Sequence, residues 1–164
     1  MTMIRDMSPQ AIVEIFRRNL TRHYFDMKGR VRRREFWSFL LCCFVIYVAA
    51  GIVEAIVERR VLTPFIGLIL LLPIAGLGAR RLQDTGRNGR LIWAYTLPAA
   101  VLELVSLIGA YGPYGMSGTL YLIFRLAALA WFLALIVFAC LWAQAGMTGP
   151  NAYGPDPRVA PVAV

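Results

Sequence analysis

Four long apolar stretches dominate the pattern of hydrophobic and polar positions along the chain. They cover residues 36–57, 61–79, 91–110 and 119–145. At 1.5 Å per helical residue, each stretch can span the roughly 30 Å hydrocarbon core of a bilayer, and a helix satisfies its own backbone hydrogen bonds there. The pattern therefore predicts an all-α integral membrane protein, a four-helix bundle in which each stretch forms one transmembrane helix.

Residues 1–35 precede the first span and contain a shorter periodic pattern. Ser8 followed by Pro9 is typical of a helix N-cap with proline at the first helical position, and apolar residues recur after it at helical spacing. We expect a short amphipathic helix that lies on the cytoplasmic membrane face or packs on the cytoplasmic ends of the bundle, two arrangements that are compatible. No apolar signal region precedes residue 36, so the first span is expected to act as an uncleaved signal anchor.

The distribution of Lys and Arg predicts the orientation of the spans. Nine of these residues precede the first span, and four more lie between residues 80 and 90 in the second loop. The first loop carries only Arg59 and Arg60, and the third carries neither Lys nor Arg. By the positive-inside rule, both termini and the second loop are expected in the cytoplasm.

Composition agrees with a membrane protein and narrows its partners. Hydrophobic residues make up 59% of the chain, and only 16% are charged, yet the net charge is +8. Positive charge that clusters at the ends of membrane spans suits anionic lipid head groups. Nucleic acid is not an expected partner, because the basic residues flank spans and no nucleic-acid-binding motif is recognisable.

Three ionisable residues fall within or near the apolar stretches: Glu54, Glu103 and Arg125. Glu103 and Arg125 are predicted to lie roughly 10 Å below the outer ends of the third and fourth spans. We expect them to form an intramembrane ion pair, with Glu54 as a possible third member. A structural bridge that sets helix register is the favoured interpretation, and a proton or anion relay that opens to the outer face is the alternative.

The second loop, residues 80–90, holds the densest set of groups that can bind an anion. Arginines at the end of the second span complement the helix dipole, and Asp84 followed by two glycines predicts a tight turn. Together with arginines before the first span, they predict a pocket for a phosphate or a lipid head group, and the alternative is that the arginines only enforce topology. The candidate binding residues are Arg30, Arg33, Arg34, Arg80, Arg81, Asp84, Gly86, Arg87 and Gly89.

An enzymatic function is not expected from this sequence. His23 is the only histidine, and the three cysteines lie inside apolar stretches without metal-binding spacing, so no metal site and no cofactor are predicted. A membrane phosphatidyl-transferase would need several aspartates to hold divalent ions, whereas Asp84 stands alone in its loop.

Three motifs occur in order along the chain, at residues 24–37, 79–89 and 149–157. In this order and spacing the chain resembles the DUF805 family of small bacterial inner-membrane proteins over nearly its whole length. The resemblance implies a four-helix protein of the bacterial inner membrane with uncharacterised biochemical function. Gln83 stands where the family frequently has histidine, so a role that depends on that histidine is not expected here.

All three motifs are predicted at the cytoplasmic boundary, where they can fold into one cap with Asp26, Asp84 and Asp156 as acceptors for arginines. The tail, residues 146–164, is rich in Pro and Gly and is expected to be non-helical. The leading hypothesis is a non-enzymatic module that binds anionic lipid or an acidic partner, with a membrane-protein partner or a homo-oligomer possible. The alternative is a component of a small oligomeric transporter or channel that uses Glu103 and Arg125.

Overall fold

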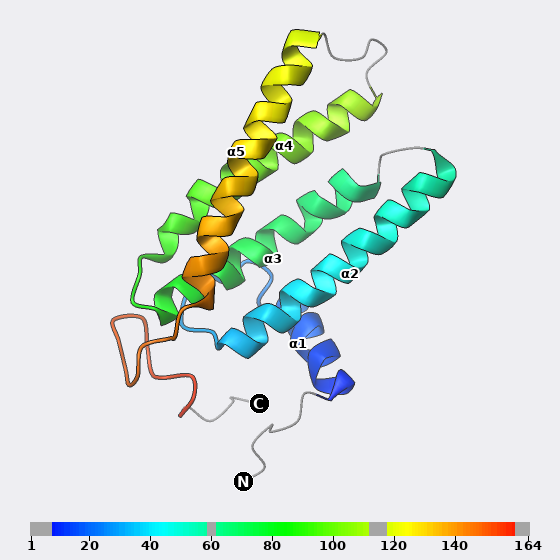
Figure 1. The fold of residues 1–164 in the computed structure, drawn as a ribbon. Helices are drawn as coiled ribbons and strands as arrows, with labels where there is room; N and C mark the ends of the chain where they lie inside the picture. The colour runs from blue at the N-terminus through cyan, green and yellow to red at the C-terminus, as the bar shows by residue number, and fades with distance from the viewer. Residues whose placement is uncertain (1–7, 59–61, 112–117, 160–164) are drawn as a thin grey trace.

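The computed structural model describes residues 8–58, 62–111 and 118–159 of the 164-residue chain. In this part of the chain the elements are helical, and their order is shown in Figure 1. They are α1 (Pro9–Thr21), α2 (Arg33–Val57), α3 (Leu62–Asp84), the 3-10 helix η1 (Gly89–Ile92), α4 (Trp93–Tyr111) and α5 (Gly118–Ala143).

Four segments of the described chain are long and apolar enough to cross a membrane: Arg33–Val57, Leu62–Asp84, Gly89–Ile108 and Gly118–Ala143. The predicted all-α four-helix membrane bundle is therefore confirmed. The helices differ from the predicted spans mainly at the polar ends, because α2 begins with two arginines and α3 continues through Asp84. Hydrophobicity indicates which residues lie in lipid, whereas backbone hydrogen bonding carries a helix beyond the apolar stretch.

The N-terminal helix α1 has the predicted start. The Ser8 side chain accepts a hydrogen bond from the backbone N–H of Ala11, and Pro9 occupies the first turn. The apolar side of α1 packs against the bundle, where the rings of Phe16 and Phe39 lie 5.4 Å apart. The structure thus shows the packed arrangement of this helix against α2 and α3.

Helix α3 lies at the centre of the arrangement, with α2 on one side and α4 on the other, and α5 packs mainly on α4. Figure 1 shows α1 and the chain after α5 at one end of the bundle. The pair α2 and α3 and the pair α4 and α5 diverge from each other towards the opposite end. We call this end the cap end. Its core is aromatic: the ring of Trp142 lies 4.9 Å from that of Phe36 and 5.6 Å from that of Tyr95.

Close packing at the cap end depends on a glycine in α3. A Cβ added at Gly78 would lie 2.8 Å from Ile92 and 3.1 Å from the indole of Trp142. The indole N–H of Trp142 also donates to the Gly78 carbonyl at 3.3 Å. A side chain at position 78 would therefore separate α3 from both η1 and α5, and the buried groups described below would lose their enclosure.

Candidate functional site

The centre of the cap end is a buried carboxylate held between two arginines. Asp84, the last residue of α3, accepts from Arg30 Nε at 2.9 Å through Oδ1 and from Arg81 Nη1 through Oδ2. The side chains of Arg30, Arg81 and Asp84 are 1%, 0% and 6% exposed. Charges so enclosed are tolerated only when paired and hydrogen-bonded, so this triad is a fixed internal element.

The same two arginines bind the backbone of the chain around and after α5. Arg81 donates from Nε to the Trp142 carbonyl at 2.8 Å and from Nη2 to the Gln144 carbonyl, which are acceptors at the end of the helix. Arg30 donates from Nη1 to the Gly149 carbonyl at 2.6 Å. The last carbonyls of a helix lack intrahelical donors, and a guanidinium satisfies them while complementing the helix dipole.

Glycines make room for this arrangement. A Cβ at Gly146 would overlap the Asp84 carboxylate, and one at Gly89 would lie 2.5 Å from Gln83 Nε2. Gly86 has a φ of +79°, a left-handed conformation that favours glycine in the turn after α3. Gly86 and Gly89 were expected to allow a tight reversal, and the structure places the reversal at residues 85–88, with residues 80–84 still helical.

Arg80 is also buried, and it faces α1 rather than the Asp84 triad. It donates from Nη2 to the side-chain carbonyl of Asn19 at 2.9 Å, and Asn19 is itself fully buried. A neighbouring ion pair, Arg18 with Glu35 at 2.5 Å, joins α1 to α2. Sequence reasoning missed Asn19, although an asparagine among the apolar positions of α1 is a signal that a buried polar partner is needed.

The third motif contributes a second fixed carboxylate. Asp156 pairs with Arg158 at 2.7 Å and accepts from the backbone N–H of Gly149 at 3.0 Å. The hydrogen bonds from Arg158 hold the pKa of Asp156 far below its usual value, although burial opposes them. Asn151 donates to the Gln83 carbonyl at 2.9 Å and ties this tail to the end of α3. The described part of the tail, residues 146–159, is non-helical, as expected.

Asp26 differs from the expectation that it accepts from an arginine. It pairs with His23 at 3.1 Å and accepts from the backbone N–H of Lys28 at 3.0 Å. Partial burial acts to raise the pKa of Asp26, but these hydrogen bonds and the charge of Arg80 outweigh it, so the pKa is lowered. The backbone of Asp26 runs over Gly76, where a Cβ would lie 3.0 Å from the Asp26 carbonyl oxygen. The three motifs therefore fold together, with arginine partners at two of the three aspartates.

Two of the candidate arginines remain exposed and border a cavity of about 430 Å³. We call it the Arg33–Arg34 groove. It lies between the first turns of α2 and the end of α5, and it is lined by Arg33, Arg34, Trp37, Ser38, Leu41 and Ala143. Arg33 Nη1 lies 3.4 Å from the Ala143 carbonyl oxygen. Arg87 is half-buried and donates to the Thr85 hydroxyl at 3.1 Å, away from this groove.

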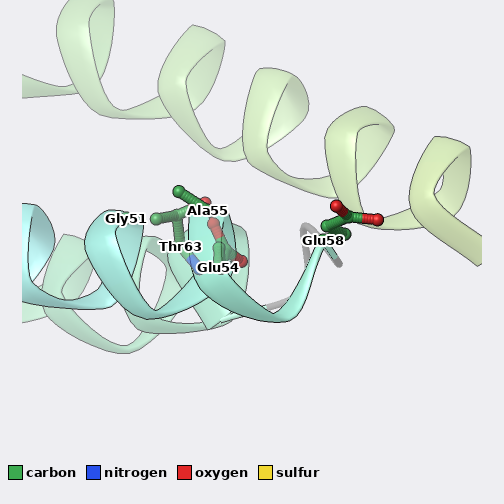
Figure 2. A pocket seen from close by; sticks show the side chains of 5 residues that line it. All are labelled: Gly51, Glu54, Ala55, Glu58 and Thr63. Atoms are coloured by element: carbon green, nitrogen blue, oxygen red, sulfur yellow. Dashed lines mark hydrogen bonds between the residues drawn. The ribbon is translucent and has the colours of Figure 1, made fainter.

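Glu54 is not part of a charge pair with Glu103 and Arg125. Its buried carboxylate accepts from the backbone N–H of Thr63 at 2.9 Å and from the Thr63 hydroxyl at 2.7 Å. In Figure 2, Glu54 and Thr63 lie together, while Glu58 projects away from them beyond the end of α2. Glu54 therefore satisfies a free N–H in the first turn of α3, where the helix dipole favours negative charge.

The expected ion pair between Glu103 and Arg125 is wrong. Among the residues that the structure describes, neither forms a salt bridge, and Arg125 donates from Nε to the Tyr121 hydroxyl at 2.9 Å with its guanidinium over the Tyr121 ring. Glu103 points instead towards Tyr47, whose hydroxyl lies 3.4 Å from Oε1. Equal depth did not decide the partner, because a helical side chain leans towards the N-terminus of its own helix, which carries Arg125 towards Tyr121.

Metal-binding groups do not gather in the described parts of the chain: no cluster of three or more His, Cys, Asp or Glu residues lies there. Cys42, Cys43 and Cys140 are free thiols on membrane-spanning helices.

The fold and the site define an integral membrane protein with four spanning helices and a polar end held by buried arginines. The chain belongs to the DUF805 family, described as "Protein of unknown function (DUF805)", whose profile matches residues 24–155. The matched range begins at the start of the first motif and ends within the third.

Two curated relatives are Escherichia coli K12 proteins. The chain is 29% identical over 146 residues to the inner membrane protein YhaH, and this alignment covers 85% of the chain and 93% of YhaH. It is 28% identical over 144 residues to the inner membrane protein YhaI, which covers 85% of this chain and 92% of YhaI. No solved structure matches the chain.

Proposed function

We propose that this protein is a non-enzymatic inner-membrane module that binds an anionic phospholipid through the Arg33–Arg34 groove. The observation that carries the proposal is the pairing of two exposed guanidinium groups with an apolar wall in one cavity of about 430 Å³. Guanidinium groups bind phosphate oxygens by charge-assisted hydrogen bonds. Trp37 and Leu41, both exposed, supply the apolar surface that an acyl chain contacts.

Burial reduces the number of candidate arginines that can contact a ligand. Arg30, Arg80 and Arg81 hold internal partners in the structure, so they are unavailable to a head group unless the cap end opens. The proposal therefore places lipid recognition on Arg33 and Arg34, and assigns the Asp84 triad to the support of the groove. Arg81 binds the end of α5, and Ala143 at that end forms one side of the groove.

The proposed orientation places the cap end in the cytoplasm. The charge distribution supports it, because among the described residues every Lys and Arg except Arg125 lies at the cap end. Two relatives are named inner membrane proteins, which supports the same membrane for this chain. In this orientation the groove meets the anionic surface of the cytoplasmic leaflet.

Replacing both groove arginines by glutamine tests the proposal. Full-length protein would be extracted gently, mixed with phosphatidylglycerol or phosphatidylcholine, and examined by native mass spectrometry for retained lipid. We expect wild-type protein to retain phosphatidylglycerol preferentially and the Arg33→Gln/Arg34→Gln variant to lose most of that preference, since each arginine near an anionic surface contributes on the order of 1 kcal/mol.

A matched control removes the same charge elsewhere. Arg22 and Arg90 are exposed and do not line the groove, so the Arg22→Gln/Arg90→Gln variant should retain the preference for phosphatidylglycerol. Equal losses in the two double variants would show only a general effect of positive charge and would refute a specific groove. Melting temperatures of all three proteins verify that the fold is intact.

A further inference from the structure

Glu103 is a polar residue of the membrane-spanning region that the proposed lipid site does not use. It lies in α4, eight residues before the end of that helix, and is half-buried. Its carboxylate packs against α3 at Gly67, where a Cβ would lie 2.6 Å from Oε1. The Tyr47 hydroxyl lies 3.4 Å from the same oxygen. Helices α2, α3 and α4 together therefore position this carboxylate.

A cavity of about 160 Å³ adjoins the carboxylate. It is bordered by Tyr47 of α2, by Glu103 and Ser106 of α4, and by Trp131 of α5. A cavity of about 10–15 Å³ is enough for one water molecule, so a cavity of about 160 Å³ has room for a small organic molecule. The indole of Trp131 is held in place, because it stacks on Tyr95 at 5.4 Å and donates to the Tyr95 carbonyl at 3.3 Å.

None of the described residues that line the cavity carries a positive charge to match the carboxylate. Among the described residues, no Lys, Arg or His lies within ion-pair distance of Glu103, and Arg125 is engaged by Tyr121. A charged group in a membrane span is costly unless it is paired. Ionisable residues within membrane spans therefore often mark substrate or ion sites. A cation from outside the chain would supply the missing charge.

We propose that this cavity binds a small organic ammonium ion. The carboxylate pairs with the positive charge, the Tyr47 and Trp131 rings contact the alkyl groups of the cation, and the hydroxyl of Ser106 can accept or donate a hydrogen bond. Aromatic rings beside a carboxylate are typical of ammonium recognition. A calcium or magnesium ion fits less well, since these ions take six or more oxygen ligands and the cavity supplies a single carboxylate.

Choline and its uncharged isostere 3,3-dimethylbutan-1-ol test the proposal with full-length protein in detergent. The two molecules share shape and hydroxyl and differ in charge. Binding of each would be measured by isothermal titration calorimetry at constant ionic strength. We expect choline to bind at least tenfold more tightly than the alcohol, and Glu103→Gln to remove that difference. Glu58→Gln, which removes an exposed carboxylate near the end of α2, should leave choline binding unchanged.

A second variant keeps the test decisive if Glu103→Gln does not fold. Trp131→Leu removes an aromatic wall and retains the carboxylate, so choline binding should weaken several-fold. Unchanged choline binding in a folded Glu103→Gln or Trp131→Leu protein would overturn the proposal. Equal binding of choline and the alcohol, or displacement of choline by an equal concentration of sodium ions, would overturn it as well.

Discussion

The Asp84 triad makes a quantitative prediction for the Asp84→Asn variant. The substitution preserves the shape of the side chain but removes the negative charge between Arg30 and Arg81, whose side chains are buried. Breaking a buried ion pair by removing one partner costs roughly 3–5 kcal/mol, because the remaining charge stays buried without compensation. At about 2–4 °C per kcal/mol for a chain of this size, the melting temperature should fall by roughly 6–20 °C.

Tryptophan fluorescence during thermal unfolding in detergent measures this effect. Trp142 is buried beside the triad, and its carbonyl accepts from Arg81, so its share of the emission from the four tryptophans changes when the cap end is lost. The Asp26→Asn variant is the matched control. Asp26 is paired with His23 and is more than one-third exposed, so the same chemical change there should cost at most about 1 kcal/mol.

A small effect of Asp84→Asn on stability would contradict this prediction. If the free energy of unfolding of Asp84→Asn lies within about 1 kcal/mol of the wild-type value, as is expected for Asp26→Asn, the two buried guanidinium groups do not need the carboxylate. The backbone carbonyls that accept from Arg30 and Arg81 would then be sufficient to hold them.

Three further predictions concern single positions. Gly146→Ala should destabilise the protein by roughly 1–3 kcal/mol in thermal unfolding, because the new Cβ would overlap the Asp84 carboxylate, whereas Gly118→Ala, with open space around it, should not destabilise it. Glu54→Gln should cost about 1 kcal/mol, since it weakens the cap of α3, and urea unfolding measures it. The pKa of Asp156 lies below its unfolded value, so its stabilising contribution is complete above about pH 5 and is lost as pH falls. The stability difference between wild type and Asp156→Asn should therefore shrink in unfolding experiments from pH 6 towards pH 3, and a difference that does not change with pH would contradict the assignment.

The helices and the assembly of the three motifs were predictable, whereas the roles of the individual arginines were not. The N-cap at Ser8 followed from local residue types, because a cap is formed within one turn. Arg30 instead binds carbonyl groups more than 100 residues away in sequence, and no local pattern contains that information. Local patterns therefore predicted a ligand site for three arginines that the structure shows bound to groups within the protein: Arg30, Arg80 and Arg81.

The membrane charges show the same distinction. Sequence position placed Glu103 and Arg125 at similar depths but did not indicate which way their side chains turn. The structure directs Arg125 to a tyrosine on its own helix, and it directs Glu103 to a cavity among three helices. Depth along a helix follows from counting residues, whereas partner choice depends on side-chain direction and on which neighbouring helix carries a glycine or a hydroxyl.

The amino-acid sequence by itself determined that this protein is a four-span membrane protein with its positive charge at one end. That information is additive along the chain, because transfer of each apolar stretch into lipid depends on its own residues and backbone. Only the tertiary structure decided which of those charges are buried and which remain exposed. Burial of a charge requires partners from several segments at once, and the cap end assembles Arg30, Arg81 and Asp84 from two of them while leaving Arg33 and Arg34 at the surface.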